Sequence, residues 1–218
     1  NQQMLIRPLF ITSFMLADFL QDNAFFGATR LVMSSASSKT AYGTAFCLQH
    51  LPQIELTGLT SERNRRFVDS LGCYQQAISY TELPGQATDQ PTLYVDFSGD
   101  VALRQRVHQH FGEALVYDCY AGSAQNTDFL VEAELPGPKP AFYFAPVQIR
   151  KRNADWGPAV VNQRFNEAQL RFIRHISSPE HRWMAVTGHQ GLAAAEVLIQ
   201  QLCGGQMDPR QGHVVVLD

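Results

Sequence analysis

Short apolar runs alternate with helical segments along most of this chain, and this alternation constrains its fold more than any other feature. Runs typical of buried strands lie at residues 30–34, 54–59, 77–80, 92–96 and 114–120. Apolar residues at helical spacing lie between them, at residues 39–50, 62–71 and 100–111. Two-sided apolar strands that alternate with helices are typical of a parallel sheet covered on both faces. We therefore predict a doubly wound, Rossmann-like parallel sheet in a three-layer α/β/α fold.

The pattern continues outside this central part, with one interruption by a Pro/Gly-rich stretch at 135–140. Before it we expect a helix at 13–26, with Ser13 as its N-cap. After it we expect, in order, a strand at 141–145, a helix at about 160–175, a strand at 183–187, a helix at 190–202 and a strand at 213–217. We predict one Rossmann-like nucleotide-binding domain over residues 1–178. Residues 179–218 form a C-terminal helix and strand that pack on this domain or elsewhere.

Composition excludes several classes of protein. The formal net charge of -3 argues against a nucleic-acid surface and against an anionic membrane surface. No run approaches the roughly 20 apolar residues of a membrane span. The four cysteines lie far apart without a C-x-x-C pair, which favours reduced, buried thiols and a cytoplasmic protein. The chain opens at Asn1 rather than at a methionine, so we expect a fragment or a processed product.

A serine-rich turn at residues 34–40 joins the first predicted strand to a helix. Backbone N–H groups at a helix N-terminus attract phosphate, and small residues let a pyrophosphate approach closely. Serine and alanine stand where a glycine-rich fingerprint has its three glycines, at Ser35, Ser38 and Ala41. We expect the pyrophosphate of a dinucleotide to contact Ser35, Ala36, Ser37, Ser38, Lys39 and Thr40. The alternative is that a serine merely caps the helix and nothing binds.

The end of the second strand is where a dinucleotide site distinguishes NAD from NADP. Here the strand ends in Thr60 and Ser61, and an Arg-rich helix follows. Hydroxyl and guanidinium groups suit a 2′-phosphate better than a 2′-hydroxyl, so we expect Thr60, Ser61 and Arg63 to bind the adenosine end of NADP(H). At least one of Arg65 and Arg66 is expected to lie only on the solvated face of the helix.

Other predicted strands end in residues that can approach a cofactor, because ligands lie at the carboxyl ends of strands in such sheets. Ser98 and Gly99 follow one strand, and Gly122 follows the next. Each glycine is equally compatible with a simple turn. Asp96 has two open interpretations, a hydrogen bond to ribose or an N-cap for the helix at residue 100.

Five motifs together resemble the cofactor domain of the medium-chain dehydrogenase/reductase superfamily, in its quinone-oxidoreductase-like branch. The resemblance is strongest to an uncharacterised bacterial family of that type. The motifs are S-A-S-S-K-T-A at 35–41, G-L-T-S at 58–61, V-D-x-x-G at 95–99, P-G-P-K-P at 136–140 and F-x-F-A-P at 142–146. The resemblance implies NADP(H), hydride transfer to a carbonyl or activated alkene of a small-molecule substrate, and a homodimer through this domain. It also implies that Phe144 and Ala145 flank the nicotinamide.

The resemblance is incomplete, since nothing here corresponds to the N-terminal barrel-like domain that completes the superfamily's catalytic cleft. Residues 179–218 are then expected to pack on this domain or on that missing one. No catalytic residue can be named, because no convincing general acid is present, and no zinc motif predicts a metal. A non-catalytic nucleotide-sensing or scaffold module is therefore an alternative. A degenerate P-loop nucleotidase is weaker, because Met33 and Ser38 replace its two glycines.

Overall fold

Six parallel strands form the central sheet of the computed structural model, which describes residues 2–122, 135–181 and 183–217. Their order in the sheet is β3-β2-β1-β4-β5-β6. The strands are β1 (Arg30–Met33), β2 (Glu55–Thr60), β3 (Gln76–Ser79), β4 (Thr92–Asp96), β5 (Leu115–Tyr120) and β6 (Ala141–Phe142). The sheet grows in one direction from β1 and in the other from β4, so the carboxyl ends of these neighbours form the topological switch point. The predicted doubly wound α/β fold is confirmed.

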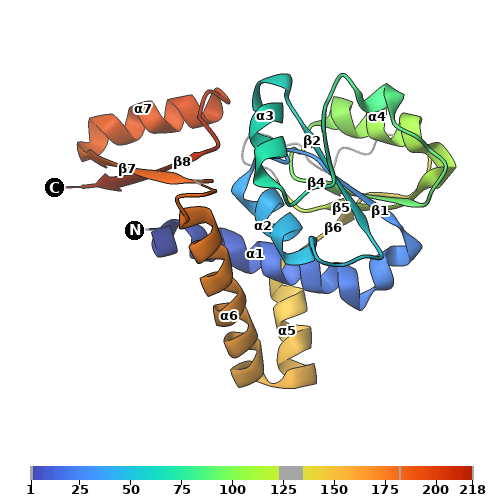
Figure 1. Cartoon of the computed structure of the whole chain (residues 1–218), viewed down its shortest axis with the longest axis horizontal. Helices are drawn as coiled ribbons and strands as arrows, with labels where there is room; N and C mark the ends of the chain where they lie inside the picture. Colours follow the sequence, from blue (N-terminus) through green and yellow to red (C-terminus); the bar gives the residue numbers. More distant parts are fainter. Residues whose placement is uncertain (1, 123–134, 182, 218) are drawn as a thin grey trace.

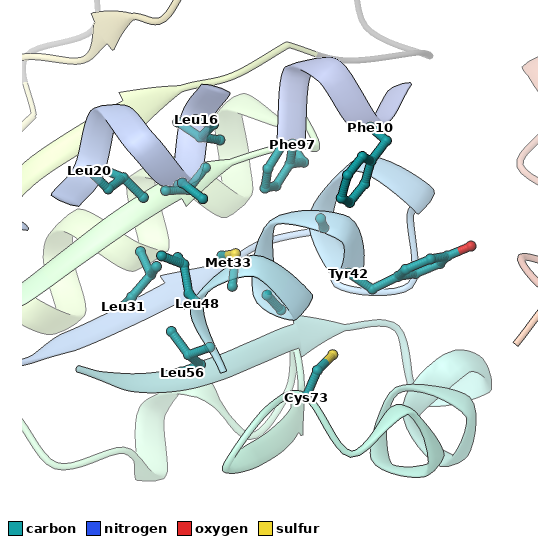
Figure 2. Close-up of a cluster of buried hydrophobic side chains, with 14 of the residues drawn as sticks. Phe10, Leu16, Leu20, Leu31, Met33, Tyr42, Leu48, Leu56, Cys73 and Phe97 are labelled. Carbon is teal, nitrogen blue, oxygen red and sulfur yellow. The ribbon is translucent and has the colours of Figure 1, made fainter. Parts of the chain in front are cut away.

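Helices cover both faces of this sheet (Figure 1). The helices are α1 (Gln2–Asp22), α2 (Lys39–Leu48), α3 (Glu62–Leu71), α4 (Val101–Phe111), α5 (Ala145–Trp156), α6 (Pro158–Ser177) and α7 (Gly191–Cys203). Figure 2 shows Leu16 and Leu20 of α1 facing the sheet residues Leu31 and Met33. On the opposite face, buried residues of α4 such as Leu103 and Val107 pack in a separate cluster with Tyr94.

The first helix is longer than predicted, because it begins at Gln2 instead of residue 13. Ile6 and Phe10 extend its buried side toward the N-terminus. Ser13 is therefore not an N-cap but lies inside the helix, where its hydroxyl donates to the Thr40 carbonyl at 2.8 Å. The helix ends at Asp22, and a short 3₁₀ segment, Ala24–Gly27, leads to β1.

Among the described residues, α1 is also the helix that is long and apolar enough to cross a membrane, which corrects the expectation that no segment approaches that length. Length and composition are weak evidence for a span, since the core helix of a water-soluble protein passes the same test. Buried residues of α1 belong to the main core cluster of this chain.

The segment after β5 departs from prediction. The expected strand at 141–145 is only two residues long, and α5 begins at Ala145 where the sequence predicted no helix. Pro146 explains this change, because proline is favoured in the first turn of a helix. Gly157, with φ +86°, separates α5 from α6.

The C-terminal part forms a unit of its own, in which β7 (Ala185–Gln190) and β8 (Gln211–Val216) pair in parallel and α7 connects them. The unit contacts the main domain, and Trp183 directly before it packs edge-on against Tyr42 with ring centroids 5.5 Å apart. All four cysteines are free, and Cys73 and Cys119 are buried as expected. Cys47 is only partly buried and Cys203 is exposed at the end of α7, which corrects the prediction of buried thiols at these two positions.

Candidate functional site

The β1–α2 turn, residues 34–40, lies at the switch point and has the backbone shape of a phosphate-binding turn. Ser35 adopts φ +46°, the left-handed conformation that glycine normally supplies. Ser38 caps α2, and its hydroxyl accepts from the Ala41 N–H at 3.3 Å. Within the described residues, the N–H groups of Ser37, Lys39 and Thr40 have no hydrogen-bond partner. The turn therefore presents three donors at the positive end of a helix.

Ala36 of this turn packs closely against Gly58 of β2, and this contact positions the turn on the sheet. Ala36 is fully buried, and its N–H donates to the Leu59 carbonyl at 3.2 Å. The Tyr74 hydroxyl donates to the Ala36 carbonyl at 3.1 Å. A Cβ on Gly58 would lie 3.0 Å from the Ala36 Cβ, so only glycine allows this approach without displacement. Ala36 thus positions the turn by packing, and its side chain faces the protein.

The two predicted phosphate-binding cations contact the loop between α7 and β8, residues 204–210. The Lys39 ammonium donates to the carbonyls of Pro209 at 3.1 Å and Gln211 at 2.8 Å. Burial lowers the pKa of Lys39. Arg63 donates to the Gly205 carbonyl at 3.0 Å. Figure 1 shows this loop extending from the C-terminal unit toward α3. Sequence reasoning missed these partners, because about 140 to 170 residues separate them from Arg63 and Lys39.

A hollow of about 430 Å³ lies between the start of α3 and this loop. Its lining includes Arg63, Asn64, Arg66, Phe67, Asp208 and Arg210. Arg65 points elsewhere and pairs with Glu82 at 2.6 Å. Of the two arginines that the sequence left ambiguous, Arg66 therefore lines the hollow.

The other residues predicted at the end of β2 directly precede α3, whose first turns line the hollow. Thr60 is buried, and Ser61 is the N-cap residue of α3 but makes no side-chain cap bond. Asn64 donates to the Ser37 hydroxyl at 3.2 Å. That hydrogen bond connects the start of α3 to the β1–α2 turn, so the hollow and the turn are contiguous.

The β4–α4 turn, residues 96–100, is organised around the buried carboxylate of Asp96. One of its oxygens, Oδ1, accepts from the N–H groups of Ser98 at 2.8 Å and Gly99 at 3.0 Å. The same oxygen accepts from the Ser34 hydroxyl at 2.8 Å, and Oδ2 pairs with Arg104 at 2.6 Å. Neither sequence interpretation describes this arrangement: Asp100 caps α4, and the Asp96 carboxylate faces protein groups.

Arg104 belongs to a buried polar cluster beneath this turn that sequence reasoning missed. His108 contacts the Asp118 carboxylate at 2.8 Å through Nε2 and the Pro136 carbonyl at 2.7 Å through Nδ1. Burial raises the pKa of Asp118, while His108 opposes the shift. The signal in the sequence is an arginine between Leu103 and Val107 on the apolar face of α4, since buried charges in proteins are paired.

The remaining predicted residues lie where neighbouring strands end. Gly99 follows β4 with φ +61°, and Gly122 follows β5 with φ +116°. Phe144 follows β6, is 53% exposed and stacks against Phe142, and Ala145 begins α5. Because all six strands are parallel, these residues share one edge of the sheet with the β1–α2 turn. That edge is where ligands bind in open α/β sheets.

Comparison with known proteins identifies relatives of this fold. A family model described as "Protein of unknown function (DUF2855)" matches residues 1–208. No curated protein matches the sequence.

Solved structures share the fold at low sequence identity. The YhdH oxidoreductase from Salmonella enterica, in complex with NADP, is 16% identical with a TM-score of 0.57 over 95% of this chain and 61% of that chain. CurA from Vibrio vulnificus, in complex with NADPH, is 15% identical with a TM-score of 0.56 over 96% and 62%. A putative NADPH:quinone reductase from Mesorhizobium loti is 13% identical with a TM-score of 0.59 over 95% and 58%. The chain thus spans about three fifths of these proteins, and the resemblance to medium-chain reductases is confirmed at the level of the fold.

Proposed function

The chain belongs to the DUF2855 family, and we propose that it binds NADP(H) at the switch point as the cofactor domain of a reductase. The observation that carries this proposal is the β1–α2 turn, whose Ser37, Lys39 and Thr40 N–H groups have no partner among the described residues and which Asn64 links to an arginine-lined hollow. Those donors suit a pyrophosphate, and the guanidinium groups suit a phosphate at the adenosine end. YhdH and CurA, two of the similar structures, are complexes with NADP and NADPH, which supports the choice of cofactor.

In this proposal, different residues of the chain bind different parts of the cofactor. Ser37, Lys39 and Thr40 bind the pyrophosphate through backbone N–H groups, and Ser35 gives the turn its shape. Arg63 and Arg66 lie at the adenosine end. In this proposal Asp96 acts as a positioning residue, because its carboxylate holds the Ser34 hydroxyl and the β4–α4 turn.

The residues that would hold the nicotinamide end of the cofactor follow β4, β5 and β6. Gly99 and Gly122 leave backbone open to a ribose, and the exposed ring of Phe144 offers an apolar contact to the nicotinamide. The chemistry supplied by a bound nicotinamide ring is hydride transfer, here to a carbonyl or activated alkene of a small molecule. This proposal assigns no substrate-binding residue within the chain, which spans about three fifths of the similar proteins.

Two features disfavour the P-loop alternative. The Lys39 ammonium donates to the carbonyls of Pro209 and Gln211, whereas the lysine of a P-loop contacts the nucleotide phosphates. The Asp96 carboxylate is bonded to Arg104 and Ser34, whereas a nucleotidase needs its carboxylate for Mg²⁺. A homodimer through this domain stays a prediction of the sequence resemblance, and a cytoplasmic location stays a prediction from the cysteine pattern.

Calorimetric titration of the protein with NADPH, NADH and Mg-ATP tests the proposal. We expect NADPH to bind, and NADH to bind more weakly. Metal-dependent binding of ATP would instead support the P-loop alternative, and no binding of any of the three would support a scaffold module. Where NADPH binds, its oxidation in the presence of quinones and enones tests hydride transfer, with NADPH alone as the control.

A further inference from the structure

The loop between α7 and β8 forms one wall of the hollow beside α3, although it lies far from α3 in the sequence. Arg63 holds one end of the loop through the Gly205 carbonyl at 3.0 Å. Lys39 holds the other end through the carbonyls of Pro209 and Gln211. Residues at the start of α2 and of α3 thus hold the loop by its backbone carbonyls, and Gln206, Asp208, Pro209 and Arg210 of the loop line the hollow.

Arg210 is the cation that this loop contributes to the hollow. Its guanidinium is oriented by Asp208, with Nε at 3.1 Å from Oδ1 and Nη2 at 3.0 Å from Oδ2. Those contacts use one edge of the guanidinium and leave Nη1 for a further acceptor. Arg66 lines the same hollow from α3, and it makes no ion pair within the described part of the chain.

The charge of the hollow favours a doubly charged anion. Arg63, Arg66 and Arg210 contribute three positive charges, and Asp208 contributes one negative charge. A phosphomonoester is close to a dianion at neutral pH and accepts several charge-assisted hydrogen bonds, so it matches both the charge and the donors. Phe67 adds an apolar surface to the lining, which suits an attached nucleobase.

We infer that the C-terminal loop supplies Arg210 as a specificity-determining residue, which together with Arg66 binds the adenosine 2′-phosphate of NADP(H). This inference rests on the proposed function and extends it, because it makes selection of NADP over NAD depend on the C-terminal unit. Arg63 then has two roles, since it lines the hollow and also anchors the loop.

The test compares affinities of the variants Arg210→Ala and Arg66→Ala for NADPH, NADH and adenosine 2′-monophosphate. Loss of one charge-assisted contact predicts at least about tenfold weaker binding of NADPH and of adenosine 2′-monophosphate, with NADH affinity within about twofold. Arg210→Lys keeps the positive charge but loses the planar set of guanidinium donors. We therefore expect its affinity for NADPH to lie between those of the unmodified protein and Arg210→Ala. Arg150→Ala, an exposed arginine on α5, is the matched control and leaves all three affinities unchanged.

The possible failures are distinguishable. If the protein prefers NADPH but Arg210→Ala changes neither dinucleotide, the inference is overturned and the proposed function stands. Equal weakening of NADPH and NADH also overturns it, because the loop then acts through the pyrophosphate turn. If no dinucleotide binds to the unmodified protein, both the inference and the proposed function fail. Circular dichroism and thermal unfolding of each variant identify any loss caused by misfolding.

Discussion

The β1–α2 turn and the β4–α4 turn follow neighbouring strands and are joined by a hydrogen bond between Ser34 and Asp96. They differ in what their backbone N–H groups contact. In the β4–α4 turn, the N–H groups of Ser98 and Gly99 donate to the Asp96 carboxylate. In the β1–α2 turn, the N–H groups of Ser37, Lys39 and Thr40 have no partner within the described ranges. We call the β4–α4 turn the closed turn, because a carboxylate of the chain accepts from its N–H groups. We call the β1–α2 turn the open turn, because three of its N–H groups have no acceptor among the described residues.

This difference distinguishes polar groups that stabilise the fold from polar groups that are available to a ligand at the same edge of the sheet. A carboxylate that already accepts several hydrogen bonds and an arginine contact stabilises the turn that surrounds it. Unpaired donors at a helix N-terminus are accessible to water or to a ligand, and they favour negative charge. Spacing alone does not distinguish the two, since both follow a buried strand and precede a helix.

The largest expected effect is on the closed turn. Asp96→Asn removes the charge that pairs with buried Arg104, so we expect a loss of about 3–5 kcal/mol in the free energy of unfolding, measured with urea. Asp100→Asn in the same turn is the control, because asparagine caps a helix about as well as aspartate, and we expect a change below about 0.5 kcal/mol. Equal losses for both variants would contradict the assigned role of Asp96.

A smaller effect is expected on the open turn, and it concerns binding. Lys39→Pro and Lys39→Ala both remove the ammonium, but only proline removes the N–H at the first position of α2. Proline is tolerated there, and Ser38 before it is already extended at ψ 147°. We expect NADPH to bind at least about tenfold more weakly to Lys39→Pro than to Lys39→Ala, since hydrogen bonds to charged groups contribute about 1.5–3 kcal/mol. Equal dissociation constants, measured by calorimetry, would show that this N–H does not contact the phosphates.

The smallest expected effect concerns the shape of the open turn. Ser35→Gly relieves a left-handed serine at φ +46°, and we expect a gain of about 0.5–1 kcal/mol in the free energy of unfolding. Ser37→Gly is the comparison, because Ser37 does not have a positive φ and its hydroxyl accepts from Asn64. We expect that variant to lose stability in the same thermal or urea measurement. A loss at both positions would exclude strain at Ser35.

Much of the fold was predictable because local periodicity determines it. The helix at 62–71 and the strand at 92–96 lie where the apolar pattern placed them. The early start of α1 and the presence of α5 were not predicted, because their buried residues are sparse and find partners on distant helices. Gln148 of α5, for example, donates to Asp18 of α1, 130 residues away.

The candidate site was predictable to a similar extent, and for the same reason. The position of the turn and the need for a left-handed residue at Ser35 follow from the strand–helix junction. The contacts of Lys39 with Pro209 and Gln211 depend on the path of the C-terminal loop, which no local pattern encodes. Arg210 could not be recognised for that reason, since nothing near it in the sequence marks a binding residue.

Gly58 has an influence beyond its own strand. A Cβ there would lie 3.0 Å from both Ala36 and Val68, so these neighbours, Ala36 of the turn among them, would have to shift by a few tenths of an ångström. The position of the β1–α2 turn therefore depends on the absence of a side chain at residue 58 of β2. A comparison of sequences limited to ligand-lining positions would omit Gly58, although this residue affects how closely a ligand can approach the β1–α2 turn.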